Sequence, residues 1–96
     1  MNIRYQGRKI ELSFLGRDTF PVNYKMIVTG MSSGKQYSKV EQEAFLYLIK
    51  DAELKCCSKK LSRIISLKQD VSFDNNTGEV EMILSGIPIF EKRNRH

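Results

Sequence analysis

An apolar stripe with helical spacing is the clearest pattern in the chain. Its members recur every three or four positions: Ala44, Phe45, Leu48, Ile49, Ala52 and Cys56. This spacing places them on one face of an amphipathic helix. Ser38 precedes the stripe and Glu41 follows three residues later, which is the spacing of a capping box at a helix start. The pattern predicts one helix over residues 39 to 55.

The segments on both sides of this helix alternate between apolar and polar residues, which is typical of half-buried strands. The alternation predicts strands over residues 2 to 5, 8 to 14, 20 to 29, 62 to 73 and 79 to 85. The apolar positions of these strands are expected to form the core with the helix stripe, and Phe73 is assigned to that core.

Turn-forming residues separate the predicted strands. Gln6-Gly7 is expected to close a hairpin between the first two strands. Residues 74 to 78, Asp-Asn-Asn-Thr-Gly, are expected to close a hairpin between the last two, with a left-handed glycine. Residues 30 to 36 are rich in Gly and Ser and are expected to form a loop. Gly86 and Pro88 are expected to break regular strand pairing.

These elements predict an α+β fold, an antiparallel sheet of four to five strands in the order ββ-β-α-ββ with the helix packed on one face. A chain of 96 residues forms one domain, here residues 1 to 90, and residues 91 to 96 are expected to be a polar, basic tail. An exposed edge at residues 20 to 29 or 79 to 85 is a candidate for pairing two copies into a homodimer.

Composition indicates a globular protein, since 41% of the residues are hydrophobic and 28% are charged. No apolar run approaches the roughly 20 residues that a membrane helix needs. The first residues, Met1 to Tyr5, contain no apolar signal-peptide core. We therefore expect a cytoplasmic protein that does not contact a membrane.

The residues needed for catalysis or metal binding are scarce. The only histidine is His96, the last residue. Cys56 and Cys57 are adjacent and lack the C-x-x-C spacing of zinc and redox motifs. We therefore predict no catalytic residues, no metal, no cofactor and no enzymatic activity.

The chain carries a net charge of +5, which favours acidic partners. Two groups of basic residues are candidates for binding nucleic acid or another anion: Lys55, Lys59, Lys60, Arg63 and Lys68, followed by Lys92, Arg93 and Arg95. The lysines near the helix end are also explained by their favourable interaction with the helix dipole. Tyr5, Tyr37 and Tyr47 are the aromatic residues expected to be exposed enough for base stacking.

Two further segments are candidate sites. Ser32, Ser33, Gly34 and Lys35 belong to the predicted loop before the helix, where backbone amides can hold a phosphate. Ile87, Ile89 and Phe90 form an apolar run after the last predicted strand, which is a candidate protein-docking patch if it is exposed.

Three short segments resemble the WYL domain of bacterial transcription regulators. They are Ile3-Arg4-Tyr5 through Arg8, Phe45-Leu46-Tyr47-Leu48 and Lys60-Leu61-Ser62-Arg63-Ile64. The tryptophan of that family is absent, and Ser62 stands where the family has Asp. The resemblance implies a barrel-like fold that senses nucleic acid or a nucleotide ligand, with Arg63 in the binding site. It also requires residues 45 to 50 to be a strand, whereas the periodicity predicts a helix.

Two functional hypotheses remain open. The first is a small basic regulator that binds nucleic acid through the Lys/Arg patch after the helix. The second is an accessory or inhibitor protein, of the type carried by phages and mobile elements, that docks on another protein through an apolar or edge-strand surface.

Overall fold

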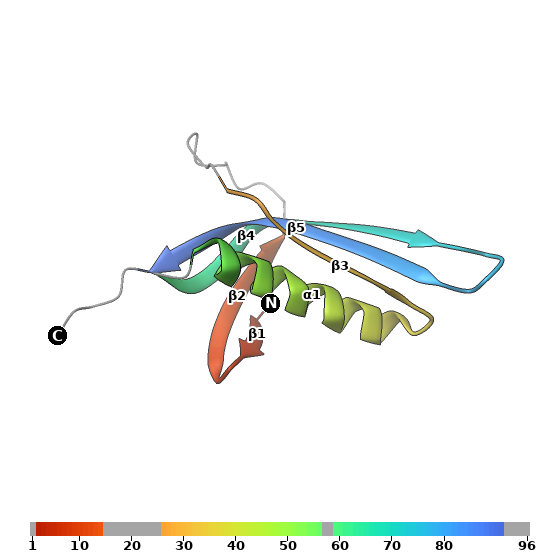
Figure 1. Ribbon diagram of the computed structural model, residues 1–96, viewed down its shortest axis with the longest axis horizontal. Helices are drawn as coiled ribbons and strands as arrows, with labels where there is room; N and C mark the ends of the chain where they lie inside the picture. The colour runs from red at the N-terminus through yellow and green to blue at the C-terminus, as the bar shows by residue number, and fades with distance from the viewer. Residues whose placement is uncertain (1, 15–25, 57–58, 92–96) are drawn as a thin grey trace.

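Five strands form one curled sheet, and a helix lies against one face of it (Figure 1). The computed structural model describes residues 2–14, 26–56 and 59–91. The elements follow in the order β1 (Asn2–Tyr5), β2 (Arg8–Phe14), β3 (Val28–Gly34), α1 (Tyr37–Lys55), β4 (Lys60–Phe73) and β5 (Val80–Glu91). This arrangement confirms the predicted α+β class.

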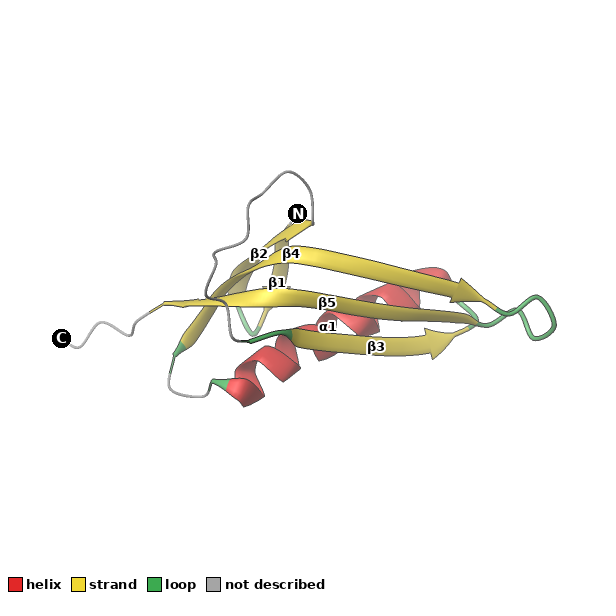
Figure 2. Cartoon of the chain, turned by 90° about the horizontal axis from the view of Figure 1, so that it is seen from above, coloured by secondary structure: helices red, strands yellow, loops and turns green. Residues whose placement is uncertain are grey.

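The sheet is mixed, so the prediction of an antiparallel sheet is wrong. The strands lie in the order β1-β2-β4-β5-β3, which also differs from the predicted order. β2 and β4 run parallel, with Leu12 beside Ile64, and the other neighbouring pairs are antiparallel. A parallel pair needs a long connection, and β3 and α1 lie between β2 and β4 in the chain. β3 thus joins the far edge of the sheet, beyond β5 (Figure 2).

Both predicted hairpin turns are confirmed. Gln6 and Gly7 have φ values of 50° and 75°, the left-handed pair that a type I′ turn requires. The β4–β5 hairpin closes through Gly78, at φ 73°, whose N–H donates to the carbonyl of Asp74 over 2.8 Å. The N–H of Asp74 in turn donates to the carbonyl of Glu79 over 2.9 Å.

The segment expected to be a Gly/Ser loop is strand β3. Gly30 faces α1 there, and a Cβ added to it would lie 2.9 Å from Cα of Leu48 and closer still to the carbonyl oxygen of Ala44. The glycine at this position therefore allows the helix to approach the strand backbone, and it does not mark a loop. Of the strand expected over residues 20 to 29, residues 20 to 25 lie outside the described residues.

α1 buries the predicted stripe, but it begins earlier than expected. The N-cap is Gln36, which makes no side-chain cap hydrogen bond. Ser38 lies inside the first turn, so the predicted capping box with Glu41 is wrong. The buried face consists of Val40, Ala44, Phe45, Leu48, Ile49 and Ala52, while Cys56 is the half-buried C-cap. Because residues 45 to 50 are helical, they cannot be the strand that the WYL resemblance requires.

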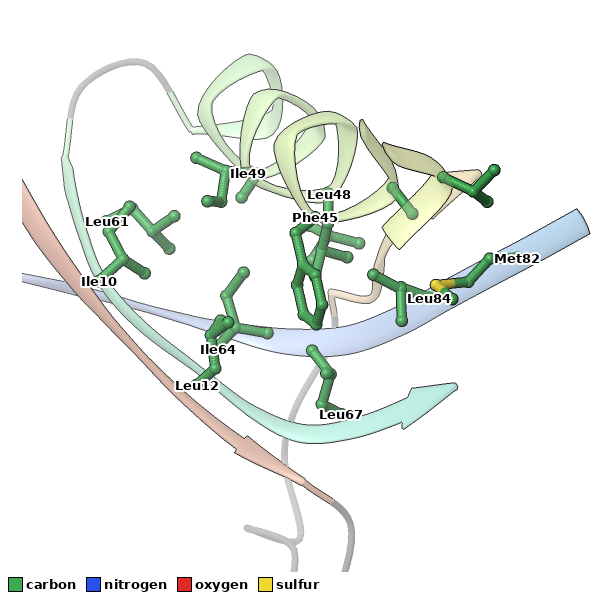
Figure 3. Packing of buried hydrophobic residues seen from close by; sticks show 14 of the residues in the cluster. Ile10, Leu12, Phe45, Leu48, Ile49, Leu61, Ile64, Leu67, Met82 and Leu84 are labelled. Carbon is green, nitrogen blue, oxygen red and sulfur yellow. The ribbon is translucent and has the colours of Figure 1, made fainter. Parts of the chain in front are cut away.

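The core lies between α1 and the concave side of the sheet (Figure 3). Phe45 points from the helix toward Leu67, with Ile64 and Leu84 on either side. Phe73 was assigned to this core, but it is 67% exposed. The assignment is wrong because α1 lies over β3 and β5, whereas Phe73 lies at the end of β4, beyond the part of β4 that pairs with β2.

β1 and β3 are the edge strands of the sheet, and β5 is paired on both sides. Residues 80 to 85 of the edge expected at 79 to 85 are therefore paired with both β3 and β4. Two helix side chains contact the first end of the β3 edge, where Asp51 Oδ2 accepts from the N–H of Thr29 over 2.9 Å and Lys55 Nζ donates to the carbonyl of Ile27 over 2.6 Å. Among the described residues, no helix has the length and apolar character needed to cross a membrane.

Candidate nucleic-acid interface

Charge is unevenly distributed along the molecule. The distal part of the β4–β5 hairpin, residues 69 to 82, contains carboxylates but no Lys or Arg: Asp70, Asp74, Glu79 and Glu81. The opposite end, where α1 ends and β4 begins, carries lysines at positions 50, 55, 59 and 60. A polyanion would be repelled by the hairpin and attracted to the end with the lysines.

An open pocket of about 670 Å³ lies at this lysine-rich end. The β1–β2 turn, the end of α1 and the start of β4 contribute to its walls. Its basic lining residues are Arg8, Lys50, Lys59 and Lys60, and its acidic lining residue is Glu53. We call this cavity, with its four basic lining residues, the basic pocket. Its volume lies within the range of about 300–1,000 Å³ that is usual for ligand sites.

Arg8 links the three elements that form the wall of the pocket. Its guanidinium donates to Glu53 Oε1 over 2.8 Å and to the carbonyl of Leu61 over 3.5 Å. These contacts join β2 to the end of α1 and to the start of β4. Glu53 is thus already paired with a cation, whereas Lys50, Lys59 and Lys60 form no salt bridge with any described residue. The pocket therefore presents three lysines whose charge a bound phosphate would neutralise.

An aromatic ring lies next to the basic pocket. The ammonium of Lys50 lies 5.8 Å from the centroid of the Tyr47 ring, within the range of a cation–π interaction. Tyr47 is 47% exposed, so a base could stack on it. Tyr37 is also exposed but lies in the first turn of α1, and Tyr5 is half-buried against the core. Tyr47 is therefore the one predicted aromatic platform that stands beside the basic pocket.

The basic residues predicted to bind nucleic acid do not all lie at one site. Lys59 and Lys60 line the basic pocket, but Lys55 is engaged by Asp51 at 3.2 Å and by the carbonyl of Ile27. Arg63 and Lys68 are exposed on β4, outside the lining of the pocket, and Arg63 lies beside Glu11 in the sheet register.

Lys92, Arg93 and Arg95 lie outside the described residues. They follow Glu91 in the sequence, and Glu91 is paired with Lys60 in the sheet.

Arg8 and Lys50 were missing from the predicted site. A signal for Arg8 was present, since it shares its strand face with the buried Ile10 and Leu12. A charged residue in phase with apolar positions usually has a partner on the element that covers that face, and Glu53 is that partner. A signal for Lys50 was also present, since it begins the cluster of basic residues that extends to Lys68, although it was not assigned to the site.

The predicted anion loop is not a loop. Ser32, Ser33 and Gly34 belong to strand β3, and Lys35 follows it. Ser32 is buried, and its hydroxyl donates to Glu43 Oε2 over 2.9 Å. A carboxylate at this position repels an anion, so the arrangement does not favour phosphate binding there.

The predicted docking run is part of β5. The pairing of β5 with β4 is irregular at Gly86, where the register shifts between Ile65 and Lys68, so the expected break is confirmed there. Pro88 pairs with Ile64, and the pairing continues to Glu91, so no break occurs at Pro88. Ile87 is 6% exposed, and Ile89 and Phe90 are half-buried. These side chains do not form an exposed apolar patch.

Comparisons with known proteins leave the chain without an assigned family. No protein-family model matches the sequence, and no curated protein is significantly similar to it.

Proposed function

We propose that this protein is a small, non-enzymatic binding protein that holds single-stranded nucleic acid at its lysine-rich end. The observation that carries the proposal is the convergence of Arg8, Lys50, Lys59 and Lys60 on one open pocket. Three separate parts of the chain supply these residues. Their mutual repulsion is relieved when a phosphate binds, which favours a polyanionic ligand.

The ring of Tyr47 supports a single-stranded ligand over a duplex. A base that stacks on Tyr47 would place its neighbouring phosphates near Lys50 and the basic pocket. Stacking on an exposed aromatic ring requires an unpaired base, and it contributes about 1–3 kcal/mol per base. The acidic distal part of the β4–β5 hairpin would point away from the bound nucleic acid.

A binding titration tests this proposal. Labelled oligothymidylate at physiological salt is expected to bind with a Kd of about 1–100 µM, the range for contacts that do not read sequence, and to bind more tightly at low salt. The double variant Lys59→Glu/Lys60→Glu is expected to abolish measurable binding. The matched control is Lys35→Glu/Lys39→Glu, which changes net charge equally at two exposed positions near the start of α1.

The two variants separate a site from a general charge effect. Equal losses in both would mean that net charge alone governs binding, and the pocket would not be the site. Unchanged binding in Lys59→Glu/Lys60→Glu would also refute the proposal.

A further inference from the structure

β1 has one side that no described strand pairs with. It forms a two-residue hairpin with β2, in which Tyr5 and Arg8 flank the turn. The pair that flanks such a turn exchanges both backbone hydrogen bonds, and the pairs then alternate along the ladder. Tyr5 and Ile3 therefore bond to β2, and the N–H and C=O groups of Arg4 and Asn2 point away from the sheet. At the other edge, Asp51 of α1 already accepts from the N–H of Thr29 in β3, and Lys55 donates to the carbonyl of Ile27 just before it.

An apolar groove runs beside this open edge. It has a volume of about 330 Å³ and lies between β1 and α1. Ile3, Phe45, Leu46 and Ile49 supply its apolar surface, Leu46 is 39% exposed, and Arg4, Glu41 and Gln42 complete its lining. A strand added to β1 would lie about 4.8 Å from it and would direct alternate side chains into this groove. The apolar part of the groove thus favours an apolar residue at every second position, since an acidic residue there would be repelled by Glu41.

Basic residues on the other face of the β1–β2 hairpin favour an acidic residue on the added strand. Arg4 stands directly opposite Lys9, and neither forms a salt bridge with a described residue. Like charges that face each other across two strands destabilise the pair. An added strand would place a residue opposite Arg4 on this same face, where a carboxylate would relieve the repulsion. A second copy pairing through β1 would instead bring a further Arg4 and Lys9 to the same place.

We propose that the β1 edge binds an extended segment of another protein, in which apolar residues alternate with acidic ones, by strand addition. The apolar residues enter the groove between β1 and α1, and an acidic residue lies opposite Arg4. The backbone groups of Asn2 and Arg4 supply the hydrogen bonds, as in other cases of strand addition to an open sheet edge. This site is separate from the basic pocket and does not depend on nucleic-acid binding.

A synthetic peptide in which glutamate and valine alternate is a suitable probe. Titration into the labelled full-length protein, followed by amide NMR, is expected to shift the signals of Asn2, Arg4 and the groove side of α1. Amide exchange of Asn2 and Arg4 is expected to slow, because they become hydrogen-bonded. A peptide of alternating lysine and valine, and one in which all glutamates precede all valines, are each expected to bind at least about tenfold more weakly.

Two variants test the two parts of the recognition. Arg4→Glu is expected to reverse the preference, so that the lysine–valine peptide binds more tightly than the glutamate–valine peptide. Asn2→Pro removes an outward N–H while the bonds to β2 remain, and it is expected to weaken binding. Lys68→Glu changes the charge at an exposed position on β4 that does not line the groove, and it is expected to leave peptide binding unchanged.

Three results would overturn the proposal. The first is that none of the peptides binds. The second is that shifts occur in the groove without slower exchange at Asn2 and Arg4, which would mean apolar contact without strand addition. The third is that the protein forms dimers through β1 in sedimentation experiments, which would identify a second copy as the occupant.

Discussion

Gly30 of β3 packs directly beneath Leu48 of α1. A Cβ at position 30 would lie 2.9 Å from Cα of Leu48 and 2.5 Å from its backbone nitrogen. The helix backbone, and no flexible side chain, occupies the space that a larger residue would need. This contact lets α1 lie close to the sheet over β3 and positions the end of α1 that carries Lys50 and Glu53.

Gly30→Ala is therefore expected to destabilise the fold. The added methyl group would meet the helix backbone, which cannot move aside as a side chain can by changing rotamer. The free energy of unfolding is therefore expected to fall by an amount near the upper end of the usual range of about 1–3 kcal/mol. Gly34→Ala is the matched control, since its Cβ would meet only the Val40 side chain at 3.3 Å. Urea unfolding of both variants measures the difference, and equal midpoints would show that the close packing at Gly30 is unimportant.

Phe45 and Phe73 are expected to differ sharply, although both were assigned to the core. Phe45 is 4% exposed at the centre of the core, so Phe45→Ala is expected to lower the free energy of unfolding by about 3–5 kcal/mol. Phe73→Ala removes a mostly exposed ring and is expected to change it by less than about 0.5 kcal/mol. Thermal or urea unfolding gives both free energies. A large loss of stability in Phe73→Ala would show that the Phe73 ring is buried.

Asp51 is expected to protect the β3 edge from pairing with another chain. Asp51→Ala leaves the N–H of Thr29 without its acceptor, and the loss of one such hydrogen bond costs about 1 kcal/mol. An uncovered edge also promotes association. Size-exclusion chromatography at increasing concentration is expected to show oligomers of Asp51→Ala, while Asp51→Asn keeps an acceptor oxygen and is expected to stay closer to the wild type.

Local patterns in the sequence predicted most of the elements but not their assembly. Alternation identified β2 and the inward positions of β5, and the stripe of Ala44 and Leu48 identified α1. The parallel pairing of β2 with β4 depends on contacts between residues about fifty positions apart, for which no local pattern exists. The prediction of a loop at Gly30 was wrong because the sequence does not show why a glycine is present. A glycine can allow a helix to pack closely on a strand, or it can allow the backbone conformations of a loop.

The same limit applies to the basic pocket. Lys59 and Lys60 were identified from their position after the helix, whereas Arg8 joins them only because β2 and β4 are neighbours. Lys55 has the same charge, but its ammonium is held at the β3 edge. A cluster of charges in the sequence therefore did not distinguish binding residues from residues that stabilise the fold.

The salt dependence of oligothymidylate binding tests the central claim most directly. For single strands, the slope of log K against log salt is about −0.7 for each phosphate contact. If Lys59 and Lys60 each contact a phosphate, Lys59→Ala/Lys60→Ala is expected to reduce the magnitude of the slope by about 1.4. Lys35→Ala/Lys39→Ala is expected to leave the slope unchanged. A wild-type slope in Lys59→Ala/Lys60→Ala would contradict the assignment of the basic pocket as the nucleic-acid interface.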